Sequence, residues 1–288
     1  MSMRFEIVTI FPDFFAGFFE NGILRRALAE ELVAVGVHDL RAFTHDRHRT
    51  VDDRPFGGGE GMVLKPEPLA EALASLGIAP KAERLAASQQ VSESSGQPFG
   101  HPTRTRVILL SAQGRPFTQA MARELATADR VVLICGRYEG VDERINEIYC
   151  DLELSIGDYV LSGGELAAAV VVDATMRLVP GVLGNEASSE FESFGVADAE
   201  IEIAEDGVPR SQHGAGGLLD YPHYTRPAEF GGLRAPEVLM NGDHAGIRRW
   251  RREQQLRKTL TNRPDLLEDA TLSKEDRKLL EAIRQESE

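Results

Sequence analysis

The stretch VLICGRYEGVDER, residues 132–144, joins a short apolar run to a glycine and a group of charged side chains. A continuous apolar run is typical of a parallel strand that is buried on both faces of a sheet. In open α/β sheets, ligands bind outside the carboxyl ends of such strands. The stretch therefore predicts a buried strand whose end, from Gly136 onward, forms the edge of a binding site. A strand followed by a turn and the solvated start of a helix would give the same pattern.

Apolar runs and helical patterns alternate along roughly the first 180 residues. This alternation predicts βαβ units and a mostly parallel α/β sheet. The expected strands are residues 5–10, 107–110, 131–135 and 152–156, and the expected helices are 66–76, 118–126 and 165–178.

The C-terminal third of the chain has a different pattern. Residues 195–217 are acidic and then rich in glycine, as in a linker, and the chain beyond Pro236 shows only helical patterns. Asp243 is a candidate cap for the helix that follows it, and Ser273 with Asp276 offers a partial capping signal for the last helix. We therefore predict a second, smaller all-α domain.

The composition is that of an ordinary globular protein, with 42% hydrophobic residues among 288. Forty-six acidic and 32 basic residues give a net charge of −14, which argues against a non-specific nucleic-acid coat protein but not against a local basic face. Cys135 and Cys150 form no metal-binding spacing and no disulfide framework. The N-terminus lacks a signal-peptide pattern and no apolar run reaches membrane-spanning length, so we expect a cytoplasmic protein. The polar residues 80–105 predict a loop or insertion.

Three segments that contain glycine follow predicted strands: SAQGR at 111–115, CGRYEG at 135–140 and SIGDYVLSGGE at 155–165. Glycine allows sharp turns and a close approach of the backbone to a ligand. Three such edges on neighbouring strands would build one pocket, whereas each segment by itself is also explained as a tight turn. None fits the dinucleotide fingerprint or the phosphate loop, which argues against a nicotinamide enzyme or an NTPase.

Two basic regions are candidate contacts for phosphates. In residues 44–62, Arg47, Arg49 and Arg54 accompany His45, His48, Asp46 and Asp52, whose spacing matches no zinc template. A solvated loop whose charges pair with one another is the alternative for this segment. Residues 248–263 hold seven basic residues and one acidic residue around Trp250, and this contrast with the acidic total indicates RNA binding, with a merely solvated helix as an equal alternative. The candidate RNA contacts are Arg47, Arg49, Arg54, Arg248, Arg249, Arg251 and Arg252.

Six motifs in order carry a resemblance to a known family. They are FTHDRHRTVDDRPFGGGEGM, CGRYEGVDER, SIGDYVLSGGE, PGVLGNEAS, LLDYPHYTRP and NGDHAGIRRWR. Together they closely resemble the bacterial tRNA (guanine-1-)-methyltransferase family, TrmD, of the SPOUT class. The match runs through nearly the whole chain apart from residues 80–105 and 195–215.

The resemblance implies an enzyme that uses S-adenosylmethionine to methylate ring nitrogen 1 of the guanosine 3′-adjacent to the anticodon, at position 37 of tRNA. It implies a SPOUT-type parallel sheet with a C-terminal trefoil knot in the first domain, and a homodimer with shared active sites. The knot comes from the resemblance alone, since an open sheet would be the default. The expected domains are a cofactor-binding α/β domain at 1–185, a flexible linker at 186–228 that carries Asp220, and a helical tRNA-binding domain at 229–288.

By position in the motifs, the resemblance also implies the residues of the site. Asp220 matches the general base and Arg177 matches the arginine that stabilises charge on the guanine oxygen. From the residues alone, Asp220 is a turn former and Arg177 a partner in a salt bridge at a helix end. Ala112 and Ala167 stand where the family commonly has proline, which affects the rigidity of the loops more than the chemistry. The implied cofactor pocket comprises Leu109, Leu110, Ser111, Ala112, Gln113, Gly136, Tyr138, Glu139, Ile156, Gly157, Asp158, Tyr159, Val160, Leu161, Gly163, Gly164 and Ala167.

The family often depends on Mg²⁺, but the sequence offers no ligand cluster in which to place this ion. Two alternatives stay open: a non-catalytic RNA-binding protein on the same scaffold, and a related SPOUT methyltransferase that acts on rRNA.

Overall fold

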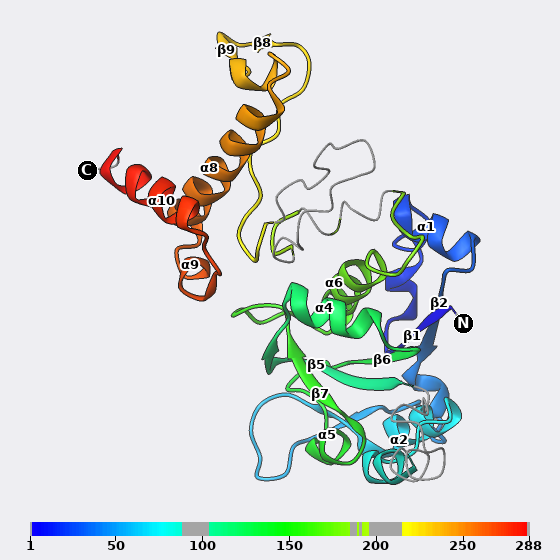
Figure 1. Cartoon of the computed structure of the whole chain (residues 1–288). Helices are drawn as coiled ribbons and strands as arrows, with labels where there is room; N and C mark the ends of the chain where they lie inside the picture. Colours follow the sequence, from blue (N-terminus) through cyan, green and yellow to red (C-terminus); the bar gives the residue numbers. More distant parts are fainter. Residues whose placement is uncertain (1, 88–103, 185–188, 190–191, 196–214, 287–288) are drawn as a thin grey trace. The chain divides into compact units, whose positions relative to one another are not determined.

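The computed structural model describes residues 2–87, 104–184, 189, 192–195 and 215–286 (Figure 1). The chain forms two compact units, Met1–Gly184 and Asn185–Glu288. Most of the segments expected to be an insertion and a linker, residues 88–103 and 196–214, lie outside the described residues. Within the described residues, no helix combines the length and the apolar character that a membrane span requires.

The first unit is built on a five-stranded parallel sheet with the strand order β2-β1-β6-β5-β7. Its strands are β1 (Met3–Thr9), β2 (Val33–Asp39), β5 (Thr105–Pro116), β6 (Arg130–Cys135) and β7 (Leu152–Ser155). A two-residue pair, β3 (Asp52–Asp53) with β4 (Val63–Leu64), lies apart from this sheet. The α/β class and the parallel sheet expected from the sequence are thereby confirmed.

Helices cover both faces of this sheet (Figure 1). On one face, η1 (Pro12–Phe15), α1 (Gly22–Ala29), α4 (Gln119–Ala126) and α6 (Glu165–Met176) enclose one apolar core. On the other face, η2 (Leu40–Phe43), α2 (Pro66–Ser75) and α5 (Glu143–Tyr149) enclose another. Because the strands are buried from both sides, they appear in the sequence as continuous apolar runs rather than alternating ones.

The expected elements are close to those of the structure, but one expected strand is longer, and β2, α1 and α5 are not among the expected elements. The strand expected at 107–110 continues to Pro116, with an irregular register against β7 between Leu110 and Arg115. The sequence analysis does not predict β2 at all. This strand lies at the edge of the sheet, is mostly half-buried, and contains Gly36, so it lacks the apolar run that reveals a central strand.

The second unit consists of α8 (His244–Asn262), α9 (Leu266–Asp269) and α10 (Lys274–Glu286), preceded by η3 (Glu237–Leu239). The expected caps are present: Asp243 accepts hydrogen bonds from the backbone of α8, and Ser273 and Asp276 cap each other's backbone N–H groups before α10. The unit is not entirely helical, because β8 (Glu229–Phe230) and β9 (Leu233–Arg234) form a short hairpin.

The core of the second unit includes a residue from the expected linker. Leu218 is fully buried with Leu256 of α8 and Ile283 of α10. The Leu219 N–H donates to the Thr259 hydroxyl, at 3.1 Å. The chain around residue 218 is therefore attached to α8.

A buried carboxylate joins three neighbouring strands, β2, β1 and β6, on the α2 face of the sheet. Glu6 of β1 is 1% exposed and contacts His38 of β2 at 2.6 Å and Arg130 of β6 at 2.9 Å, and it also pairs with Arg4. The Cβ of any residue other than glycine at position 36 would overlap the Glu6 carboxylate. Burial by itself raises the pKa of Glu6, but the hydrogen bonds with His38 and Arg4 hold that pKa below its ordinary value.

We predict that Glu6→Gln lowers the free energy of unfolding by about 1–3 kcal/mol at neutral pH, because it leaves buried donors without their charged acceptor. A carboxyl whose pKa is lowered by folding stabilises the protein above its unfolded-state pKa, and this contribution is lost as the pH falls through the folded-state pKa. The difference between variant and wild type should therefore shrink below about pH 4. Denaturant titrations at several pH values measure it, with Glu30→Gln as the control because the Glu30 side chain is 54% exposed. A difference that persists in acid would contradict the prediction.

Candidate active site

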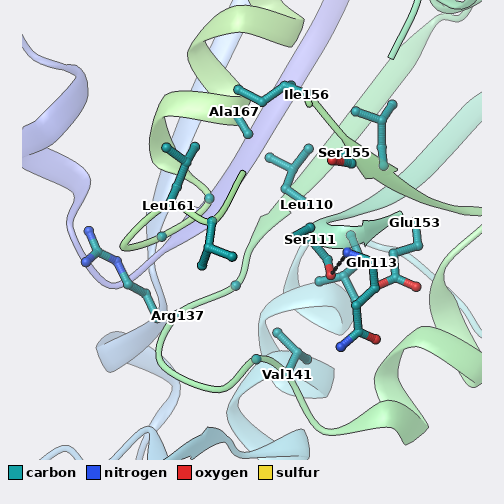
Figure 2. A pocket seen from close by; sticks show the side chains of 18 of the residues that line it. Leu110, Ser111, Gln113, Arg137, Val141, Glu153, Ser155, Ile156, Leu161 and Ala167 are labelled. Carbon is teal, nitrogen blue, oxygen red and sulfur yellow. Dashed lines mark hydrogen bonds between the residues drawn. The ribbon is translucent and has the colours of Figure 1, made fainter. Parts of the chain in front are cut away.

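One pocket of about 430 Å³ opens at the carboxyl ends of β5, β6 and β7 (Figure 2). Its size is within the range of small-molecule and cofactor sites. The three glycine-containing segments singled out in the sequence all contribute to it. Of the residues implied for the cofactor pocket, all line this pocket except Asp158. Lining residues that the sequence analysis missed are Arg137, Gly140, Val141, Glu143, Glu153, Leu154, Ser155 and Ser162. All of them lie within or beside the quoted motifs.

The first wall of the pocket is an irregularity in β5. Residues 111–114 leave the ladder with β7, which resumes when Arg115 faces Leu154. Gly114 makes this possible, since a Cβ at that position would overlap the backbone of Leu154. Three of the departing residues, Ser111, Ala112 and Gln113, line the pocket (Figure 2).

The second and third walls are the segments after β6 and β7, which meet at glycines. The Gly164 N–H donates to the Gly136 carbonyl at 2.9 Å. A Cβ on Gly164 would lie 2.7 Å from the Cα of Cys135, closer than real Cβ atoms come to backbone. Glycine at 164 is therefore required for the contact that closes this side of the pocket.

An ion pair fastens the same two segments. Glu165, the first residue of α6, is 2% exposed and accepts hydrogen bonds from the Arg137 guanidinium at 3.1–3.4 Å and from the Thr9 hydroxyl at 2.7 Å. The Arg137 guanidinium also lies over the ring of Phe11, 4.5 Å from its centroid. Figure 2 shows the Arg137 side chain directed away from Gln113 and Glu153, toward the N-terminal part of the chain. Arg137 thus supports the pocket wall from behind.

The pocket carries negative charge on one side. Glu139, Glu143 and Glu153 line it, and the Asn146 amide donates to Glu143 at 2.9 Å and to Glu153 at 3.4 Å. Such a wall favours a cationic ligand. Cys135, the neighbour of Gly136 in the chain, is buried, and burial raises the pKa of its thiol well above the usual value. It is therefore a neutral packing residue and not a nucleophile.

The two residues implied for catalysis belong to different units. Arg177 is half-buried at the C-terminal end of α6, where its N–H bonds the Asp173 carbonyl. Asp220 lies in the second unit with its side chain 21% exposed, 2.9 Å from Nε2 of His223.

The candidate RNA-binding arginines have different surroundings. Arg47, Arg49, Arg54 and Arg249 are exposed, and Arg248 is half-buried. Arg252, by contrast, is 12% exposed and holds Asp276 through two hydrogen bonds at 2.7 and 3.0 Å, so it links α8 to α10. The sequence around Arg252 does not indicate this partner, which lies 24 residues away.

The histidines near residue 46 have structural partners. His45 contacts Glu71 of α2 at 2.8 Å, and Asp46 accepts hydrogen bonds from Thr50 and the His48 backbone. Those hydrogen bonds lower the pKa of Asp46, and the one from the Thr50 hydroxyl has the largest effect. Across the part of the chain that the structure describes, no group of three or more His, Cys, Asp or Glu is arranged to hold a metal ion.

Comparison with known proteins identifies the family. The model of the family described as tRNA (Guanine-1)-methyltransferase TrmD matches residues 3–269. The chain belongs to this family. A tRNA (guanine-N(1)-)-methyltransferase from Koribacter versatilis is 54% identical over 282 residues, covering 98% of both chains. Relatives with the same name from Dehalococcoides mccartyi and Geobacter metallireducens are 48% and 46% identical, each covering at least 96% of both chains.

Membership of the TrmD family makes the protein a tRNA methyltransferase, and it confirms the resemblance that the six motifs carry. The matched range includes the residues that line the pocket. The segments 111–115, 135–140 and 155–165 all lie within the matched range.

We predict that Gly164→Ala destabilises the first unit by about 1–3 kcal/mol, because the new methyl group must push the backbone of Cys135 aside. The displaced segments line the pocket, so the affinity for S-adenosylmethionine should fall at least about tenfold. Thermal unfolding and calorimetric titration measure the two effects. Gly17→Ala is the matched control, since its Cβ would meet nothing within 4 Å. Normal cofactor binding by Gly164→Ala would show that the pocket tolerates a wider separation.

Proposed function

We propose that this protein transfers the methyl group of S-adenosylmethionine to ring nitrogen 1 of the guanosine at position 37 of tRNA, 3′-adjacent to the anticodon. The observation that carries the proposal is the pocket at the ends of β5, β6 and β7, in a chain that the TrmD family model matches from residue 3 to 269.

The residues of the pocket fit S-adenosylmethionine. Glycines at 136, 157, 163 and 164 permit close backbone contacts with an adenosyl group. The carboxylates of Glu139, Glu143 and Glu153 supply negative charge near a sulfonium. When bound, the cofactor supplies an activated methyl group. The trefoil knot around this pocket stays a prediction from family membership.

The chemical task of the protein is to align the guanine and remove its N1 proton. A ring nitrogen that carries a proton is a weak nucleophile, so a base must accept this proton as the methyl group is transferred. We assign this role to Asp220, whose carboxylate would accept the N1 proton while N1 bonds to the methyl carbon and the bond from that carbon to sulfur breaks, leaving S-adenosylhomocysteine. Arg177 would stabilise the negative charge that develops on the guanine carbonyl oxygen. Asp158, absent from the pocket wall, has no assigned step. A role for Mg²⁺ stays a prediction from the resemblance.

We further propose a homodimer in which each active site takes residues from both chains. The cofactor pocket belongs to the first unit, whereas Asp220 belongs to the second. This separation in the chain suits a site that one protomer completes for its partner.

Two other functions would give different results in one experiment. Mass-spectrometric mapping of tRNA treated with enzyme and S-adenosylmethionine should find one methyl group on N1 of guanosine 37. A non-catalytic RNA-binding protein would leave no methyl group on any RNA. A related rRNA methyltransferase would modify rRNA and leave tRNA unmodified.

Asp220→Asn should reduce single-turnover methylation by roughly a hundred- to ten-thousand-fold, because the amide keeps the shape of the side chain but cannot accept the proton. The affinity for S-adenosylmethionine should stay near wild type, since the pocket belongs to the first unit. Rapid quench with labelled cofactor measures the rate, and calorimetry measures binding. If Asp220→Asn methylates at close to the normal rate, Asp220 is only a turn former.

A mixed dimer tests the shared site. We expect Gly164→Ala and Asp220→Asn chains to be nearly inactive alone, and a heterodimer purified through two different tags to recover about half of the wild-type activity, because one of its two sites is then unaltered. If subunits exchange and the heterodimer stays inactive, each site is made by a single chain.

The two arginines at the start of α8, half-buried Arg248 and exposed Arg249, should contact phosphates. Arg248→Ala with Arg249→Ala should weaken tRNA binding and reduce the slope of log affinity against log salt by about one unit for each lost contact. The matched control is Arg284→Ala, an exposed arginine of α10. Filter binding at several salt concentrations measures the slope, and an unchanged slope would refute the assignment.

A further inference from the structure

A chain of side-chain contacts leads from α8 to Asp220. The Arg251 guanidinium of α8 lies 4.8 Å from the ring centroid of Tyr221. The Tyr221 ring lies 4.8 Å from the His223 ring, tilted by 47°. His223 Nε2 lies 2.9 Å from Oδ2 of Asp220. All four residues belong to the second unit.

Both carboxylate oxygens of Asp220 are held. Oδ1 accepts the backbone N–H of Tyr221 at 2.8 Å, while Oδ2 contacts His223. The backbone is fixed as well, because the Asp220 N–H donates to the Ser193 hydroxyl at 2.9 Å. Each carboxylate oxygen has two acceptor sites, so one on each oxygen remains for a substrate N–H. The plane of the carboxylate is thus set before any substrate arrives.

His223 needs support of its own, since 69% of its side chain is exposed. The Tyr221 ring supplies one contact surface, and the Arg251 guanidinium holds that ring from α8. Nε of Arg251 is buried and has no hydrogen-bond partner within the described residues. The face of the Tyr221 ring, 4.8 Å away, offers this guanidinium a cation–π contact.

We propose that His223 is a positioning residue for the reaction, and that Tyr221 and Arg251 hold it against Asp220. The proposal rests on the proposed role of Asp220 as the base. Its physical basis is orientation: a catalytic group displaced by about 1 Å can lose about a hundredfold in rate. The hydrogen bond to Oδ2 removes the rotational freedom that an exposed aspartate would otherwise keep.

Removal and conservative replacement of His223 test this role. In single-turnover methylation, His223→Ala should be roughly 10- to 100-fold slower than wild type. His223→Gln should recover much of the loss, because its amide nitrogen can reach Oδ2 in place of Nε2. The affinity for S-adenosylmethionine should not change in either variant. His244→Ala, which removes another exposed histidine of the same unit, is the matched control.

A double mutant separates positioning from a general structural role. If His223 acts through Asp220, His223→Ala should have little further effect on the residual rate of Asp220→Asn. An equal loss in both backgrounds would overturn the proposal, as would a normal rate for His223→Ala. Tyr221→Leu, which removes both ring contacts, should reproduce the loss, and Tyr221→Phe should restore most of the rate.

The outcomes distinguish this inference from the proposed function. A near-normal rate for Asp220→Asn would show that Asp220 is not the base, and the positioning role of His223 would then also be refuted. A slow Asp220→Asn together with a normal His223→Ala would leave the base in place and refute the positioning role alone.

Discussion

The approach of Gly164 to the end of β6 is the contact on which the rest of the site depends. The Gly164 N–H donates to the Gly136 carbonyl at 2.9 Å, which joins the segments after β6 and β7. A methyl group on Gly164 would overlap the backbone of Cys135. The ion pair between Arg137 and Glu165 then holds the two segments from behind, and Gly114 lets β5 leave its ladder to form the remaining wall. The pocket is therefore formed by backbone segments that approach closely at glycines, and side chains complete its walls.

Buried ion pairs recur at points where elements distant in the sequence must be joined. Glu6 links three strands on one face of the sheet, Glu165 links β1 to the segment after β6, and Asp276 links α10 to α8. Each carboxylate is nearly inaccessible and is fully engaged by arginine or by other donors, which is the condition under which burial of a charge is tolerated. The arginines therefore differ in their surroundings. Some hold buried carboxylates and join elements of the fold, whereas others, such as Arg47 and Arg249, are exposed.

Several features of the fold followed from local patterns, and others did not. The central strands β6 and β5 were predictable because burial on both faces produces apolar runs, and the α8 and α10 caps because Asp243 and Ser273 precede helical periodicity. The edge strand β2 was not predictable, because it is mostly half-buried and contains Gly36, so it has no continuous apolar run. In the sequence, Arg252 does not differ from its basic neighbours. Its ion pair with Asp276 forms only through the packing of α10 on α8. Leu218, in a stretch with the composition of a linker, is buried in the core of the second unit.

The sequence by itself determined the α/β class, the three glycine-containing edges and the family, because each depends on residue types at short, fixed spacings. The tertiary structure alone decided which residues share the pocket: it added Arg137, Glu143 and Glu153 and left out Asp158. It also decided the successive contacts from Arg251 through Tyr221 and His223 to Asp220. The physical reason is distance along the chain. Hydrophobic periodicity and turn chemistry act over a few residues, whereas a pocket and a chain of contacts depend on how strands and helices far apart in the sequence pack together.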